Sequence, residues 1–442
     1  MARSGGPAGR ARLGKAVALV LTCLVLPACA GRPTGVLKPV ESAVPDAVHV
    51  DMLVATTREP AKDEAVLFSG ERGRDLSLTN IVVSVPPEPS RIVGEVQWPR
   101  RLPADPAKEF ATVKVEPFDL DATKLWLRRE ARRKGRVLLF VHGYNNRFED
   151  AVFRFAQIAH DSRADAVPVL FTWPSRGSLF AYNYDRESTN YSRDALEHIL
   201  HALARDPSVT SVTVLAHSMG TWLAVEALRQ MAIRDRRIPA KITDVVLAAP
   251  DLDVDVFGRQ WREMGERRPR FTMFVSNDDL ALRVSRRLAG DVDRLGAIDP
   301  TQEPYRSQFE AEGIRIHDLT ALRTGDRLHH AKFAESPDVV RLIGERLIAG
   351  QTVTDSRVGL GERLGAVVSS AANVVGTTAS AAISAPVAVV DPETRAGYRE
   401  QVERIGRSLA TTAGATAGVL TGPAGGRGAS PPPGPDAAGG NR

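Results

Sequence analysis

Cysteine is nearly absent from this chain. Its 442 residues include two cysteines, Cys23 and Cys29, and both lie near the N-terminus. The rest of the sequence therefore has no thiol nucleophile, no disulfide and no cysteine-based zinc site. Acidic and basic residues nearly balance at a formal net charge of +5, and four of the basic residues lie in the first 15 positions. This small excess does not favour nucleic-acid binding.

The N-terminus has the pattern of an export signal. Residues 1–15 are basic and residues 16–28 carry no charge, which predicts a signal peptide over residues 1–28. The uncharged run is too short for a comfortable transmembrane helix. The segment LPAC at residues 26–29 resembles a bacterial lipobox, although proline at its second position is unusual, and this predicts lipid attachment at Cys29.

The predicted signal indicates the cell envelope. We expect an exported bacterial protein that is anchored to a membrane through Cys29 and faces the periplasm. The alternative is an ordinary signal peptide whose cysteine is incidental. The protein is exported in both cases.

The composition divides the remaining chain into three parts. Residues 29–47 contain glycine, proline and serine with few large apolar residues, which predicts a tether. We expect a folded domain over residues 48–350 and a largely disordered, alanine-, glycine- and proline-rich tail over residues 351–442. Residues 364–390 carry no charge, but their small residues and Pro386 argue against a membrane-spanning helix.

Strand and helix patterns alternate along the expected domain. Continuous apolar or β-branched runs predict strands at 49–57, 78–86, 137–141, 167–171, 213–216, 242–249, 271–275 and 313–320. Amphipathic stretches predict helices at 148–160, 188–204 and 219–231, near Phe257, through Arg286 and from Asp338. This alternation predicts a three-layered α/β fold with a mostly parallel central sheet and helices on both faces.

The sharpest local motif is VLAHSMG at residues 214–220, which places Ser218 between a strand and a helix. Gly220 matches the last glycine of the G-x-S-x-G motif, and Ala216, which is also small, replaces the first. The pattern predicts a nucleophile elbow with the Met219 amide at a helix N-terminus, where developing negative charge is stabilised. A serine that merely caps the helix is the alternative.

A His-Gly turn closes an earlier strand in the segment FVHGYNN at residues 140–146. In α/β-hydrolases this turn supplies the second amide of the oxyanion hole. We assign that amide to Tyr144, with Asn145 as the alternative. His142 belongs to the turn itself and is expected to be structural.

A serine nucleophile needs a base, and the base needs an acid that orients it. In α/β-hydrolases the acid and then the histidine follow the serine along the chain. Asp278 and Asp279 follow the predicted strand at 271–275, and His329 and His330 precede the last predicted helix. The order alone leaves both members of each pair open. Asp251 is a further candidate acid, because some α/β-hydrolases use an earlier strand.

The chain resembles the DUF900-type α/β-hydrolases, an exported family of unknown function in the esterase/lipase superfamily. The resemblance covers roughly residues 48–350 and rests on FVHGYNNRFEDAVFRFAQI, FTWPSRG, YDRES, LAHSMG, VVLAAPDLDVDVF, SNDDLAL and HHAKFAESP. In that family an aspartate precedes x-Ala-Leu and a histidine precedes x-x-Phe. The resemblance therefore implies an α/β-hydrolase fold and selects Asp279 and His330 as the partners of Ser218.

Other polar residues have simpler interpretations. Asp251, Asp253 and Asp255 lie within five residues, but a solvated loop and a helix cap are expected there, since oxygen-ligand cation sites need six or more donors. Asp318 and the neighbouring histidines His329 and His330 would also permit a metal site. We do not expect one, because no third donor has a fixed spacing. The segments 173–175 and 182–188 fit an acyl pocket or simple packing equally well.

The sequence therefore predicts a serine hydrolase that cleaves carboxylic ester or thioester bonds through an acyl-enzyme. No cofactor or metal is implied, because nucleophile, proton transfer and charge stabilisation all come from side chains and amides. The expected substrate is a small-molecule or lipid-like ester. The alternatives are an acyltransferase and a non-catalytic binding or envelope-structural module with the same fold. Acyl-chain length and oligomeric state are not predicted.

Overall fold

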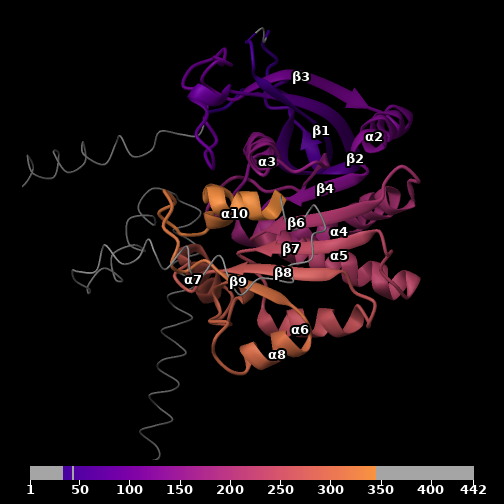
Figure 1. The fold of residues 1–442 in the computed structure, drawn as a ribbon, viewed down its shortest axis with the longest axis vertical. Coiled ribbons are helices and arrows are strands. Elements are labelled where there is room, and N and C mark those ends of the chain that lie inside the picture. The colour runs from indigo at the N-terminus through magenta and orange to yellow at the C-terminus, as the bar shows by residue number, and fades with distance from the viewer. Residues whose placement is uncertain (1–32, 42–43, 345–442) are drawn as a thin grey trace, which may run out of the picture. The chain divides into compact units, whose positions relative to one another are not determined.

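One nine-stranded sheet runs through the part of the chain that the computed structural model describes, residues 33–41 and 44–344. The strand order is β3-β2-β1-β5-β4-β6-β7-β8-β9, with β1 and β2 near one end and β8 and β9 near the other (Figure 1). The strands are β1 (Val48–Pro60), β2 (Phe68–Val85), β3 (Ala111–Phe118), β4 (Arg136–Val141), β5 (Val167–Thr172), β6 (Ser211–His217), β7 (Ile242–Ala248), β8 (Arg270–Val275) and β9 (Arg315–Asp318).

Helices cover both faces of this sheet. One core contains residues of α2 (Leu120–Lys134), α4 (Tyr182–Arg205), α5 (Met219–Asp235) and α6 (Val254–Glu263), and the other contains residues of α3 (Phe148–Asp161), α9 (Lys332–Glu335) and α10 (Pro337–Leu342). The buried residues of β4 alternate between the two cores, as a strand buried on both faces requires. The predicted three-layered α/β architecture is confirmed. The other helices of the described residues are α7 (Leu280–Leu288), α8 (Tyr305–Ala311) and the 3-10 helices η2 (Glu88–Ser90) and η3 (Leu295–Ala297).

The register of the parallel strands gathers several turns at one edge of the sheet. Val141 of β4 pairs with Ala216 of β6, and His217 of β6 pairs with Ala248 of β7. Ala248 pairs in turn with Phe274 of β8. The carboxyl ends of these strands therefore lie side by side, and open α/β sheets bind ligands beyond such ends.

Several elements differ from the sequence expectation: α8 was not predicted, and β2 begins at Phe68 and not near residue 78. The strand β3 and the helix α2 were not expected, and β3 forms an antiparallel edge with β2. Lys114, Glu116 and Pro117 of β3 are exposed, and Lys114 forms an ion pair with Glu116. Charges and proline are common on edge strands and weaken the apolar signal from which strands are predicted.

Residues 33–41 also pack on the domain. Val36 and Leu37 are buried, and the Thr112 hydroxyl donates a hydrogen bond of 3.2 Å to the Val36 carbonyl. This part of the segment expected to be a tether, residues 29–47, therefore belongs to the packed structure. The expected signal peptide, Cys29 and all of the expected tail, residues 351–442, lie outside the described residues. In residues 33–41 and 44–344, no helix is long and apolar enough to cross a membrane.

We expect Leu37→Ala to lower the free energy of unfolding by about 2–5 kcal/mol, because it removes a fully buried leucine and leaves a cavity. The neighbouring exposed residue provides the control, and Lys38→Ala should change stability by less than about 0.5 kcal/mol. Chemical denaturation followed by circular dichroism measures both. Equal, small effects would mean that residues 33–41 are not packed on the sheet.

Candidate active site

Ser218 lies on a strained turn between β6 and α5. Its backbone angles are φ 51° and ψ −127°, a region that costs a non-glycine residue of order 1–3 kcal/mol. The Ser218 amide donates to the Ala248 carbonyl of β7 at 2.9 Å, and the Ser218 carbonyl accepts from the Thr221 hydroxyl at 2.6 Å. The strained strand-to-helix turn expected from the motif is therefore present.

Two glycines allow this turn to pack against the turn after β4. A Cβ atom on Gly220 would lie 2.2 Å from the His142 carbonyl oxygen, and one on Gly143 would lie 2.8 Å from the Ser218 Cβ. Neither position has space for a side chain without a backbone shift. The missing side chains thus bring the His-Gly turn directly against the serine.

His330 and Asp279 form a buried pair at the same edge of the sheet. The His330 Nδ1 donates to the Asp279 Oδ2 at 2.6 Å, and the Asp279 side chain is fully buried. The other oxygen of Asp279 accepts the Leu282 amide at 2.9 Å, since Asp279 is the N-cap of α7. Burial lowers the pKa of His330, but the charge and hydrogen bond of Asp279 outweigh it, so the pKa lies above its ordinary value.

The adjacent residues form a second pair with a different environment. The His329 Nδ1 donates to the Asp278 Oδ2 at 2.8 Å, and the His329 side chain is 42% exposed, compared with 16% for His330. The Lys332 ammonium contacts the other oxygen of Asp278 at 2.7 Å. Burial raises the pKa of Asp278, but the hydrogen bonds from Lys332 and Ser276 and the charge of Lys332 together hold the pKa below its usual value.

The carboxylate of Asp251, the further candidate acid, has partners other than a histidine. Its carboxylate accepts from the Ser285 hydroxyl and, at 3.3 Å, from the Tyr182 hydroxyl. The buried Arg294 guanidinium lies 3.3 Å from it. Asp253 instead caps α6, so the acidic cluster is divided between separate tasks. Within the described part of the chain, no group of three or more His, Cys, Asp or Glu residues is arranged to hold a metal ion.

The amides after the His-Gly turn have different partners. The Asn145 amide donates to Asp185 at 3.4 Å, and the Asn146 amide donates to the Ser175 hydroxyl at 3.1 Å. Among the described residues, none accepts a hydrogen bond from the Tyr144 amide. The contact with Asp185 makes Asn145 the weaker candidate for an oxyanion-hole amide.

Arg58, which was not predicted as a site residue, holds the loops after β4 and β5 through hydrogen bonds. It is fully buried at the end of β1 and donates to the carbonyls of Ser175 and Asn146, each at 2.8 Å. Burial lowers the pKa of Arg58 to about 10, so it stays charged at neutral pH, with Asp185 as the largest opposing charge. The available sequence signal was an arginine directly after the predicted strand at 49–57.

Two further histidines are held neutral. Burial and then the Arg58 charge lower the pKa of His142 to about 3, and its Nε2 accepts the Trp173 amide at 3.1 Å. Burial and then the His330 charge lower the pKa of His217 well below its ordinary value. The His217 Nε2 lies 3.3 Å from the His330 carbonyl oxygen. His142 is thus part of the turn, and His217, which the sequence analysis missed, packs beneath His330.

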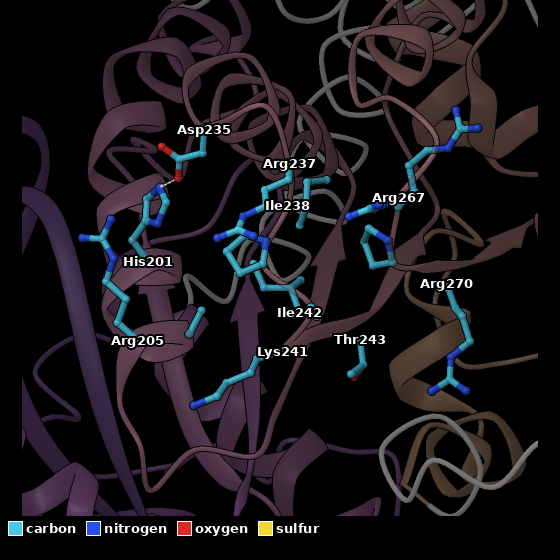
Figure 2. Close-up of a pocket in the computed structure, with 15 residues that line it drawn as sticks. His201, Arg205, Asp235, Arg237, Ile238, Lys241, Ile242, Thr243, Arg267 and Arg270 are labelled. Carbon is cyan, nitrogen blue, oxygen red and sulfur yellow. Dashed lines mark ion pairs between the residues drawn. The ribbon is translucent and has the colours of Figure 1, made fainter.

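A separate cavity of about 860 Å³ lies at the opposite edge of the sheet, around the first residues of β7 and β8. Figure 2 shows basic side chains along it, among them Arg237, Lys241 and Arg267. Its acidic residue Asp235 is paired with His201 at 3.1 Å. The cavity contains none of the candidate catalytic residues and is not part of the site.

We expect Asp279→Asn to lower the pKa of His330 below the ordinary histidine value. The amide removes the charge that raises this pKa but leaves the burial that lowers it. Histidine NMR titration measures the shift, with Asp278→Asn as the matched control that should leave His330 nearly unchanged. A His330 pKa that does not respond to Asp279→Asn would contradict the pairing.

Comparisons with known proteins assign the chain to a family. The chain is 26% identical over 152 aligned positions to the uncharacterized protein alr1448 of Nostoc sp., and the match covers 29% of this chain and 39% of that relative. The structure of a lipase-esterase related protein from Clostridium acetobutylicum matches 48% of this chain and 93% of its own, at a TM-score of 0.28 and 12% identity. A family model for alpha/beta hydrolases of unknown function (DUF900) matches residues 119–346. Since that match covers more than half of the 442 residues, the chain belongs to the DUF900 family of alpha/beta hydrolases.

Proposed function

We propose that this protein is a serine hydrolase that cleaves carboxylic ester or thioester bonds, with Ser218, His330 and Asp279 as its catalytic triad. The observation that carries the proposal is the buried 2.6 Å hydrogen bond between His330 and Asp279 at the sheet edge where Ser218 lies on its strained turn. Family membership supports the class of enzyme. The nucleophile, base and acid also follow the chain order of α/β-hydrolases.

In the proposed reaction, the Ser218 hydroxyl attacks the acyl carbonyl while His330 Nε2 takes its proton. Asp279 accepts a hydrogen bond from the Nδ1–H of His330, so Nε2 is the nitrogen that accepts the proton. The charge of Asp279 stabilises the imidazolium that forms. The amides of Met219 and Tyr144 donate to the oxyanion of the tetrahedral intermediate. Its collapse breaks the ester bond, and the alkoxide or thiolate leaves with the proton from His330.

The acyl-enzyme is then hydrolysed by the reverse use of the same groups. His330 takes a proton from water, the resulting hydroxide attacks the acyl carbon, and the carboxylic acid is released as Ser218 recovers its proton. If another alcohol replaced water at this step, the product would be a transferred acyl group.

The surroundings of the two pairs favour His330 over His329 as the base. The Asp278 carboxylate is shared with the Lys332 ammonium, which offsets the charge that would stabilise an imidazolium. Within the described residues, Asp279 has no cationic partner other than His330. A fully buried, unshared carboxylate has the stronger effect on its histidine, because the low dielectric strengthens the interaction.

We expect a fluorophosphonate probe to label the whole purified protein at Ser218. Ser218→Ala removes the nucleophile and His330→Ala removes its base, so each should abolish labelling, while His329→Ala should retain it. In-gel fluorescence measures labelling, and circular dichroism checks that each variant is folded. Labelling that survives His330→Ala but not His329→Ala would move the base to His329, and a folded protein without labelling would favour a binding module.

We expect kcat/KM for a soluble ester to rise with pH as His330 loses its proton, with a midpoint above 6.5 because the pKa of His330 is raised. Asp279→Asn should lower kcat by about 10⁴-fold. It should also move the midpoint to lower pH, because the raising charge is gone. Asp278→Asn is the matched control and should cost less than about tenfold. A larger loss in Asp278→Asn or Asp251→Asn would assign the acid to that residue.

A further inference from the structure

Large exposed hydrophobic side chains collect on segments that follow the carboxyl ends of β5, β8 and β9. They are Leu179, Phe180, Leu280, Val284, Leu288 and Leu328, which are 38–65% exposed. We call these six residues the apolar rim. They belong to the sheet edge that carries Ser218, since β5, β6, β8 and β9 run parallel. A group of large exposed apolar side chains at one side of a protein favours a binding surface, whereas single exposed residues do not.

The helix α7 supplies the central part of the apolar rim. Leu280, Val284 and Leu288 recur every fourth residue and therefore lie on one face of the helix. Together they extend over about 12 Å along its axis. The opposite side of α7 contributes Leu282 and Ser285 to the interior. α7 is thus packed on one side and exposes an ordered apolar stripe on the other.

Direct contacts join the apolar rim to the candidate site. Asp279 caps α7 immediately before Leu280. The Leu280 amide donates to the Leu328 carbonyl at 2.9 Å, and Leu328 precedes the two histidines. On the other side, the Tyr182 and Ser285 hydroxyls lie 2.8 Å apart, which connects α7 to the start of α4, just after Phe180. The apolar residues therefore border the site rather than a remote part of the surface.

Basic side chains flank the apolar rim. Arg283 and Arg287 are exposed on α7, and Arg327 is exposed beside Leu328. In the ranges that the structure describes, no acidic side chain forms an ion pair with any of these three arginines. Arg286 differs, because Asp291 and Asp293 pair with it at 2.9 and 3.0 Å.

This combination fits one kind of partner best. A dry protein interface would bury the three arginines without counterions, which is costly. At a bilayer surface, anionic headgroups pair with the arginines while leucine, valine and phenylalanine enter the boundary of the acyl chains. We propose that the apolar rim docks on bilayers that contain anionic phospholipids and that Ser218 acts on acyl esters presented there. The second half of this proposal rests on the proposed function.

The test is co-sedimentation of the full-length chain with vesicles of phosphatidylglycerol and phosphatidylcholine. All proteins carry Cys29→Ser, so that lipid attachment at that residue cannot dominate binding. We expect Val284→Glu/Leu288→Glu to bind at least tenfold more weakly, because two charges replace inserted apolar side chains. Leu120→Glu/Leu125→Glu, on exposed positions of α2, is the matched control and should bind as the parent does. Arg283→Gln/Arg287→Gln should lose about tenfold on anionic vesicles and little on pure phosphatidylcholine.

The same variants are assayed on two esters, one soluble with a short chain and one embedded in the vesicles. Val284→Glu/Leu288→Glu should keep hydrolysis of the soluble ester and lose at least tenfold on the embedded one. A parent that does not bind vesicles, or a variant that binds equally well, overturns the proposal. A parent dimer that this variant dissociates overturns it too, because a second copy would be the partner. Rim-dependent binding without hydrolysis of either ester would refute the proposed function alone.

Discussion

The close packing of two backbone turns is the constraint on which the candidate site depends. The turn after β4 lies against the turn after β6, with glycine at both contact points, Gly143 and Gly220. Ser218 holds a strained conformation there, and such strain persists only where the surroundings determine the backbone. Hydrogen bonds to β7 and to the first turn of α5 supply that support. A side chain at either glycine would separate the turns and remove the reason for the strain.

A buried charge, that of Arg58, holds the turn after β4 in place. The guanidinium of Arg58 donates to carbonyls of three segments, at Ser69, Ser175 and Asn146. Because a guanidinium has five donors in a rigid fork, one side chain can fix several loops at once. Asp185 completes the arrangement by accepting the amides of Asn145 and Arg176. The same network that binds the Asn145 amide leaves the adjacent Tyr144 amide without an acceptor among the described residues.

The sequence predicted those features that depend on neighbours along the chain. The elbow at Ser218 is defined within seven residues, and the alternating strands and helices within short windows, so both could be predicted. Arg58 could not, because its partner Thr172 is 114 residues away and no local pattern links them. His217 was missed for a similar reason, since its role depends on the His330 backbone across the fold. Val36 and Leu37 lie in a segment whose composition is that of a linker, and the core that buries them includes residues far along the chain, such as Phe110 and Phe153.

The choice between the adjacent pairs shows why local order was insufficient. Both histidines form a hydrogen bond to an aspartate, at 2.6 and 2.8 Å, so neither spacing nor pairing distinguishes them. The difference comes from burial and from Lys332, which lies 54 residues beyond Asp278. Lys332 also donates to the Leu319 carbonyl, so this second pair is tied into the packing between β8 and the segment after β9. The charge of Lys332 therefore holds the loop after β8 against the segment after β9.

Asp279 has two roles that use different oxygens. Oδ1 accepts a hydrogen bond from the Leu282 amide at the start of α7, whereas Oδ2 accepts a hydrogen bond from the Nδ1–H of His330. The helix cap fixes the carboxylate independently of His330. The imidazole is therefore oriented by a group that the fold itself holds in place. An amide at this position can still accept the Leu282 N–H through its oxygen. The structure of α7 and the charge beside His330 are consequently separable, although a single side chain provides both.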